Sequence, residues 1–371
     1  MTKSYDELIR PEVLEFKPYV PGLSIDEIRD RYGLQNIIKM ASNENPLGVS
    51  PVVQEVIKNN AGLAFRYPAA GNPVLCQAIG GHLGVDPQRI VCGNGSDEII
   101  DLLIRVLAVP GRHNIVAFRP CFSIYKLQAR LCGVEFRQSA LNPDFSFDWE
   151  GLLGLVDNNT RIVFLTNPDN PSGFAAAAEE IADFASRLPE SVILVIDEAY
   201  IDFANPLDKY SSHIMPAKSE RTVVLRTFSK MFGLAGLRLG FGVLPLFLAD
   251  YLRRVRLPFS VNILAEKAGT AALDDTVFRQ TTLDLIFHGR KFLTQMLLAM
   301  DFQVFPSQAN FLMFQPDAAH DAQTVFEELL KRGIIIRPLK SYGLPELLRV
   351  SIGTDHENKA VIKGLKEICN E

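Results

Sequence analysis

The stretch RTVVLRTFSKMFGLAGLRLGFGVL, residues 221–244, places two apolar runs on either side of a polar, glycine-containing segment. The runs at 221–228 and 239–244 lack a regular polar alternation, which predicts strands that are buried on both faces. Between them lie Ser229, Lys230 and Arg238, so that a hydroxyl, an amine and a guanidinium share one short loop. A solvated loop lysine is the common alternative, and the neighbouring segments are needed to choose between the two.

Similar apolar runs recur through the middle of the chain. They are RIVC (89–92), NIVAF (114–118), RIVFLT (161–166) and SVILVIDEA (191–199). Two of the intervening segments, 96–108 and 175–188, have helical periodicity, and we expect Ser96 and Asp97 to cap the first of these helices. Alternating strands and helices predict an α/β fold with a large, mostly parallel sheet flanked by helices on both faces.

The pattern of apolar and polar residues changes after about residue 260. Long helical patterns are followed there by short apolar runs such as NFLMF (310–314) and LLRVSIGT (347–354), which predict a smaller α+β domain. The first forty residues carry the Pro- and Gly-containing segment FKPYVPG and no succession of strands. We therefore expect an N-terminal arm at 1–40, a large α/β domain at 41–260 and a small domain at 261–371.

Composition limits the possible partners. The 371 residues carry a net charge of −5, with 47% hydrophobic and 22% charged residues, which is typical of a globular protein without a basic nucleic-acid surface. No segment has the length and apolarity of a signal peptide or a membrane span, so we expect a cytoplasmic protein with small-molecule substrates and no membrane partner. Five cysteines without a CxxC pair and six scattered histidines predict reduced thiols and no metal site.

Polar residues follow the predicted strands. In open α/β sheets, ligands bind at the carboxyl ends of the strands, so these residues are the candidates for a site. The turn at 93–97 opens a helix whose free N–H groups attract an anion, although such turns often serve only as connections. Asn170 follows one strand, whereas Asp197 and Tyr200 follow another. A carboxylate at the end of a buried strand requires a cationic or hydrogen-bonding partner.

Together these groups match pyridoxal 5′-phosphate (PLP). The helix start with Ser229 and Arg238 fits its phosphate, Asp197 fits its protonated ring nitrogen, Tyr200 and Asn170 fit its ring oxygen, and Lys230 fits its aldehyde. The rival nucleotide motifs G-x-G-x-x-G and G-x-x-x-x-G-K-[ST] do not occur between a strand and a helix. A nucleotide- or S-adenosylmethionine-binding enzyme would leave Lys230, Asp197 and Arg238 unexplained.

The motifs also resemble a known family. SNENPLG (42–48), RYP (66–68), GNGSDE (93–98), NPDNPSG (167–173), DEAY (197–200), TFSKMFGLAGLRLGF (227–241) and LLRVSIGT (347–354) occur in the order found in PLP-dependent aminotransferases of the aspartate aminotransferase fold, fold type I. Among these, the chain most closely resembles the aminotransferases that act on histidinol phosphate. The resemblance extends from about residue 16 to 354.

The resemblance implies roles for individual residues. Lys230 would form the imine with PLP and carry a proton between the substrate and the cofactor. The other catalytic residues would be Asp197 at the ring nitrogen and Tyr200, with Asn170, at the ring oxygen. The phosphate would be held by Ser96, Asp97, Ser229 and Arg238, and by Tyr67 of a second subunit in a homodimer with shared sites. Phe122 stands where the family usually has a tyrosine stacked on the ring, so stacking would persist without the phenol hydrogen bond.

The substrate is also an implication of the resemblance. Arg349 would bind a carboxylate or phosphate, Arg337 and Tyr19 of the N-terminal arm would assist, and Asn170 would contact the substrate as well. The expected reaction is transamination of L-histidinol phosphate with 2-oxoglutarate to give imidazole acetol phosphate and glutamate, a step of histidine biosynthesis. An aromatic amino acid aminotransferase, a threonine-phosphate decarboxylase of cobalamin synthesis and a catalytically idle PLP-fold regulator remain alternatives.

Overall fold

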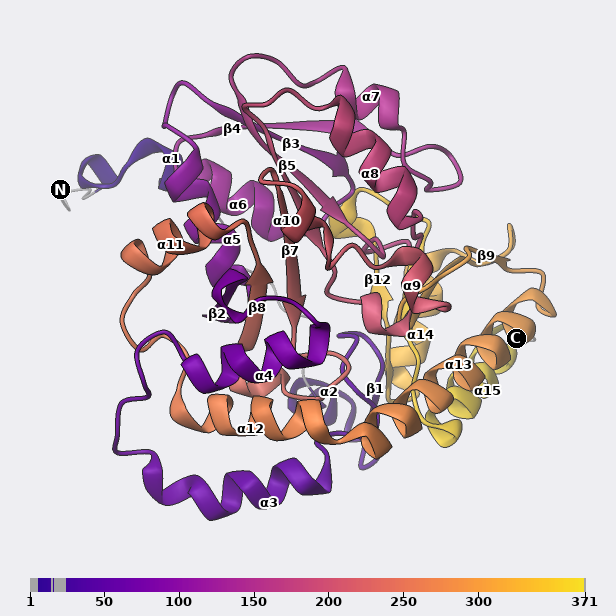
Figure 1. Ribbon diagram of the computed structural model, residues 1–371. Coiled ribbons are helices and arrows are strands. Elements are labelled where there is room, and N and C mark those ends of the chain that lie inside the picture. Colours follow the sequence, from indigo (N-terminus) through magenta and orange to yellow (C-terminus); the bar gives the residue numbers. More distant parts are fainter. Residues whose placement is uncertain (1–5, 15, 17–24, 370–371) are drawn as a thin grey trace, which may run out of the picture.

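A seven-stranded sheet forms the centre of the larger part of the molecule (Figure 1). The computed structural model describes residues 6–14, 16 and 25–369. The strands, in the spatial order β2-β8-β7-β6-β5-β3-β4, are β2 (Ile90–Asn94), β8 (Leu239–Val243), β7 (Thr222–Thr227), β6 (Ile193–Asp197), β5 (Thr160–Thr166), β3 (Asn114–Arg119) and β4 (Glu135–Ala140). Only β8 runs antiparallel to its neighbours. The predicted mixed, mostly parallel α/β sheet is confirmed.

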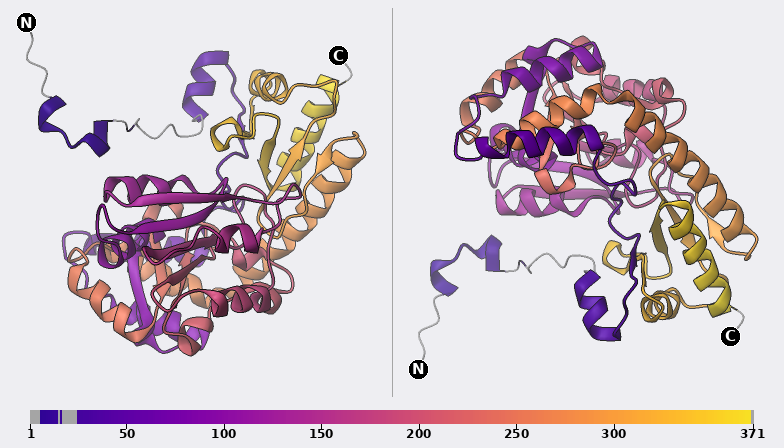
Figure 2. Two further views of the ribbon diagram at one scale, coloured as in Figure 1. Left: turned by 90° about the horizontal axis from the view of Figure 1, so that it is seen from above. Right: turned by 90° about the horizontal axis from the view of Figure 1, so that it is seen from below.

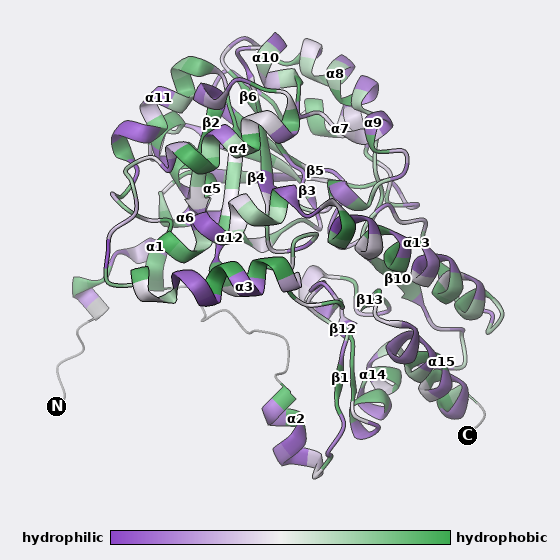
Figure 3. Ribbon diagram, turned by 60° about the horizontal axis from the view of Figure 1, so that its bottom comes forward, coloured by the Kyte–Doolittle hydropathy of each residue, from purple (hydrophilic) through white to green (hydrophobic). Residues whose placement is uncertain are grey.

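Helices cover both faces of this sheet. One face carries α5 (Ser96–Leu107), α6 (Ser123–Leu131) and α11 (Leu246–Val255), which share a buried core with the strands. The other face carries α4 (Pro73–Leu83), α7 (Trp149–Leu153), α8 (Ala178–Arg187) and α12 (Ile263–Asp274), with α3 (Pro51–Asn60) outside α12. Because both faces are covered, the inner strands are apolar throughout. Peripheral helices such as α13 and α15 instead alternate hydrophobic and hydrophilic residues (Figure 3).

Two details differ from expectation. The edge strand β4, EFRQSA, was not predicted, because a half-exposed strand with charged residues has no apolar run. The expectation that Ser96 and Asp97 cap α5 is wrong, since the cap is Gly95 and makes no side-chain capping bond. Gly95 has φ 79°, a conformation that residues with a side chain rarely adopt, so the chain turns into the helix one residue earlier.

The smaller part is α+β, as predicted. A four-stranded antiparallel sheet has the order β12 (Arg337–Pro338), β13 (Leu348–Ser351), β10 (Phe311–Gln315) and β9 (Gln303–Val304). Its helices are α13 (Thr276–Leu298), α14 (Ala322–Lys331) and α15 (Asp355–Cys369), and β1 (Ile38–Lys39) pairs with β11 (Ile334–Ile335). The short helices α1 (Pro11–Leu14), α2 (Ile25–Tyr32), α9 (Leu207–Tyr210) and α10 (Met215–Lys218) complete the described α-helices.

The smaller part lies to one side of the large sheet, with α13 running from one part to the other (Figures 1 and 2). The core is continuous between them, since buried residues of α12, α13 and β10 belong to one cluster. Helix α12 packs against α3 and α4, so residues 263–274 lie with the large sheet. A division of the chain within α13 therefore fits the packing better than one at residue 260, and the division into domains remains a proposal. Within the described residues, no helix combines the length and apolarity needed to cross a bilayer.

Candidate active site

A cavity of about 230 Å³ opens at the carboxyl edge of the large sheet. Its wall contains loops that follow β2, β3, β5, β6 and β7, because parallel strands present these loops at one edge. Most of the predicted site residues line this cavity: Ser96, Asp97, Phe122, Asn170, Asp197, Tyr200, Ser229, Lys230 and Arg238. The strand-end reading of the sequence thus selected residues that the fold brings together.

Lys230 lies just beyond the end of β7. Its Nζ donates a hydrogen bond to the backbone oxygen of Ser42 at 3.0 Å and lies 5.7 Å from the ring centre of Tyr200. Burial, aided by the positive charge of Arg349, lowers the pKa of Lys230 to about 8. More of this amine is therefore neutral at neutral pH than for a solvated lysine, and a neutral amine is the nucleophilic form.

Asp197 is the last residue of β6 and is only 3% exposed. Burial raises the pKa of its carboxyl to about 6. The hydroxyl of Tyr125 donates to its Oδ2 at 2.7 Å, and the backbone N–H of Ala199 donates to Oδ1 at 3.2 Å. No ion pair to Asp197 occurs among the described residues, so this carboxylate suits a ligand that brings a cation.

The start of α5 forms a close-fitting cup. The backbone of Arg238 is in the left-handed region, with φ 54°. Its Nη2 donates a hydrogen bond to Oδ2 of Asp97 at 3.2 Å. A Cβ on Gly95 would lie 2.6 Å from Nη2 of Arg238, and one on Gly240 would lie 2.3 Å from the backbone nitrogen of Ser96. The absence of side chains at these glycines leaves the N–H groups of the helix start accessible to an anion such as phosphate.

Arg349 does not itself line the cavity but lies behind its wall, where it contacts the lining residue Asn170. It is 5% exposed, and its Nη1 donates to Oδ1 of Asn170 while Nη2 donates to the backbone oxygen of Ala41 at 3.0 Å. Its Nε is buried without a hydrogen-bond partner in the described structure. Because a buried N–H without a partner is costly, this donor is available for a ligand oxygen.

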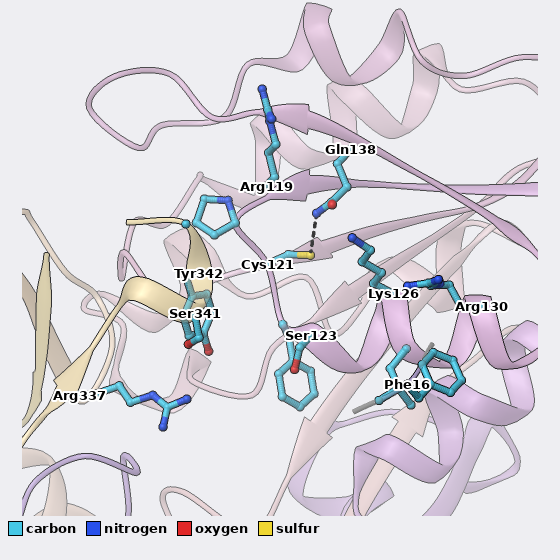
Figure 4. A pocket seen from close by; sticks show the side chains of 14 residues that line it. Phe16, Arg119, Cys121, Ser123, Lys126, Arg130, Gln138, Arg337, Ser341 and Tyr342 are labelled. Carbon is cyan, nitrogen blue, oxygen red and sulfur yellow. Dashed lines mark hydrogen bonds between the residues drawn. The ribbon is translucent and has the colours of Figure 1, made fainter. Parts of the chain in front are cut away.

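The remaining predicted residues lie elsewhere. Arg337 pairs in register with Arg349 across β12 and β13, but its side chain lines a neighbouring cavity that also includes Phe122 (Figure 4). Tyr67 is 81% exposed on a loop, where its ring stacks on Phe259 with centroids 4.8 Å apart. Tyr19 lies outside the described residues. The individual roles assigned to all of these residues remain predictions.

Several buried residues at the site were missed by the sequence reading. Tyr125 joins Asp197 to Thr166, whose Oγ1 lies 2.9 Å from the Tyr125 hydroxyl. A possible signal was the i, i+3 spacing of Tyr125 from Phe122 at the start of α6, which places both on one side of the helix. Glu198 points away from the cavity and pairs with Arg226 at 2.8 Å in the interior. The strand-end pattern selected Asp197 but did not indicate that its neighbour Glu198 is held in an interior ion pair.

Comparison with known proteins gives consistent matches. The model of the family "Aminotransferase class I and II" matches residues 35–365. A histidinol-phosphate aminotransferase of Nitratidesulfovibrio vulgaris, strain Hildenborough, is 62% identical over 97% of this chain and 96% of its own length. One from Oleidesulfovibrio alaskensis is 58% identical over 97% and 94%. The structure of a Sinorhizobium meliloti histidinol-phosphate aminotransferase in complex with pyridoxal-5′-phosphate superposes with a TM-score of 0.87 at 26% identity, covering 98% of this chain and 97% of that one.

Proposed function

Because the chain belongs to the class I and II aminotransferases, we propose that it transfers the amino group of L-histidinol phosphate to 2-oxoglutarate. The products would be imidazole acetol phosphate and L-glutamate. Near-full-length relatives at 58–62% identity bear this activity in their names. The strongest structural support is the placement of a partly buried amine, Lys230, and a buried carboxylate, Asp197, in one cavity.

The cofactor of this family is PLP, and the cavity fits it. The start of α5 with Arg238, at one end of the cavity, matches the phosphate of PLP. The carboxylate of Asp197, which has no cationic partner among the described residues, matches the ring nitrogen. When bound, PLP stabilises negative charge at the substrate carbon that loses a proton. Asp197 would hold the ring nitrogen protonated, Asn170 and Tyr200 would bind the ring oxygen, and Phe122 would cover one ring face. Lys230, once its amine is free, would move the proton between substrate carbon and cofactor.

Two arginines would bind the ends of the substrates. Arg349 offers a buried N–H without a partner, and Arg337 stands beside it on the adjacent strand. Guanidinium groups bind phosphate and carboxylate with similar bidentate geometry, so the same pair could accept histidinol phosphate and then 2-oxoglutarate. Arginines alone do not exclude an aromatic aminotransferase or a threonine-phosphate decarboxylase, but the names of the relatives favour neither alternative.

The substrate is tested by the visible spectrum of the PLP-loaded protein. We expect L-histidinol phosphate, added alone, to convert the bound cofactor stoichiometrically to its amine form, and 2-oxoglutarate to reverse the change. L-Phenylalanine and L-threonine phosphate serve as comparison donors. Conversion by phenylalanine alone would identify an aromatic aminotransferase, whereas loss of carbon dioxide from threonine phosphate would identify the decarboxylase.

We further propose a cytoplasmic homodimer in which Tyr67 reaches the cofactor phosphate of the partner. A group of large apolar side chains is exposed around this loop, including Phe65, Tyr67, Leu257 and Phe259. Exposed apolar surface of this kind suits a second copy of the chain, and a two-fold axis would give each site the partner's tyrosine.

Mixing two defective variants tests the shared site. We expect Lys230→Ala alone to be inactive and Tyr67→Ala alone to be weakly active at limiting PLP. In a hybrid dimer, one site would combine Lys230 of one subunit with Tyr67 of the other, so mixing after reversible dissociation should restore about a quarter of wild-type activity. If Tyr67 serves its own subunit, or the protein is monomeric, mixing will restore nothing.

A further inference from the structure

A second cavity, of about 710 Å³, lies beside the proposed cofactor site. One wall comes from the end of β3 and from α6, and the other from β12 and the turn at 341–343 (Figure 4). Phe122 lines both cavities, so the larger one adjoins the smaller. A ligand in the larger cavity would contact both parts of the molecule.

The charges around this cavity are all positive. Arg119, Lys126 and Arg337 line it, and no Asp or Glu is among its described lining residues. Within the described structure, none of these three side chains has a hydrogen-bond or ion-pair partner. Arg130 lies farther along α6, over the ring of Phe16 at 5.6 Å. Cations without counter-charges in a concave site concentrate positive potential, which attracts anions.

The two cavities differ in charge. The smaller cavity contains the carboxylates of Glu44, Asp97 and Asp197 as well as its cations. The positive lining of the larger cavity continues toward it through Arg337, which is paired in register with Arg349. Arg119 and Lys126 are exposed whereas Arg349 is buried, so a dianionic group arriving from solvent would meet the two outer cations first.

We propose that the exposed cations Arg119 and Lys126 each provide an outer phosphate-binding contact at the rim of this cavity, which captures the phosphate group of the donor before its amine reaches Lys230. The proposal rests on the phosphorylated donor inferred above. Both side chains are exposed on the cavity rim and act on association, so they raise the rate of substrate capture without taking part in the chemical step. They thereby favour phosphorylated donors over unphosphorylated ones.

The test compares single variants of equal charge change. Arg119→Gln and Lys126→Gln each remove one rim cation. Arg112→Gln is the control: it removes an exposed cation that precedes the first residue of β3, whereas Arg119 is the last residue of that strand. We expect each rim variant to lower kcat/KM for L-histidinol phosphate by about threefold to tenfold at low ionic strength, with kcat unchanged. The loss should shrink as salt is added, because salt screens exposed charges. Turnover of unphosphorylated L-histidinol should stay unchanged, as should all parameters of Arg112→Gln.

Binding of inorganic phosphate to the PLP-loaded protein, followed by calorimetry, supplies a measurement that does not depend on turnover. We expect the rim variants to bind phosphate more weakly than the wild type and than Arg112→Gln. If histidinol phosphate is not a substrate at all, the proposed function fails, but weakened phosphate binding in the rim variants would still support the outer phosphate-binding contacts. Unchanged kcat/KM together with unchanged phosphate binding would overturn them, as would equal losses for L-histidinol and its phosphate.

Discussion

Lys230→Ala should abolish transamination while the protein still folds and binds PLP without a covalent bond. The substitution removes both the amine that attaches to the cofactor aldehyde and the base that moves the substrate proton. General base catalysis alone supplies up to about 10⁴-fold, so we expect a loss of at least that size. The measurements are the first-order rate of the half-reaction with L-histidinol phosphate and the mass of the borohydride-treated protein, which should show no fixed cofactor.

A lysine outside the cavity provides the control for this experiment. Lys209 is exposed beside Tyr210, with its Nζ 5.2 Å from the ring centre, and Lys209→Ala should keep wild-type turnover and one borohydride-fixed cofactor. The lowered pKa of Lys230, about 8, sets it apart from such a residue, because burial and Arg349 favour its neutral form. Retained turnover in Lys230→Ala, or cofactor fixed at another lysine, would refute the assignment.

Much of the fold could be predicted because burial is recorded in the sequence. The parallel strands β5, β6 and β7 are covered on both faces, and therefore appear as continuous apolar runs. The edge strand β4 is half exposed and was missed for the same physical reason. The candidate cavity followed from one topological rule, that ligands bind where parallel strands end. That rule requires the order of residues along the chain but no knowledge of side-chain contacts.

Contacts between distant residues could not be predicted in this way. The hydroxyl of Tyr125 reaches Asp197 across 72 positions of sequence, and Arg349 reaches Asn170 across 179. Glu198 and Asp197 are neighbours with the same charge, but Asp197, the last residue of β6, faces the cavity whereas Glu198 turns inward to Arg226. These contacts depend on how the helices and strands pack together. The positions of polar residues after predicted strands carry no information about that packing.

Asp197→Asn should reduce the half-reaction rate by about 10²- to 10³-fold, the size of loss seen when one electrostatic contact to a reacting group is removed. An amide has nearly the shape of the carboxylate, and its oxygen could still accept from the Tyr125 hydroxyl. It carries no charge, however, and so could not keep the cofactor ring nitrogen protonated. The fold should therefore survive, and the loss should appear in the rate of proton removal from the substrate carbon, measured with donor deuterated at that carbon.

Asp169→Asn is the matched control, because Asp169 is also buried and burial also raises its pKa to about 6. Its carboxylate accepts from the backbone N–H of Ser172 at 3.0 Å and from the Ser172 hydroxyl, and an amide oxygen at the same place could accept those bonds. We therefore expect this variant to keep the wild-type rate within a factor of about three, as for substitutions that leave hydrogen bonding intact. Equal losses in both variants would mean that any buried carboxylate at this edge of the sheet matters only for folding. A near-normal rate in Asp197→Asn would remove Asp197 from the ring nitrogen, and Asp97 and Glu44 would then be the carboxylates of the cavity left to test.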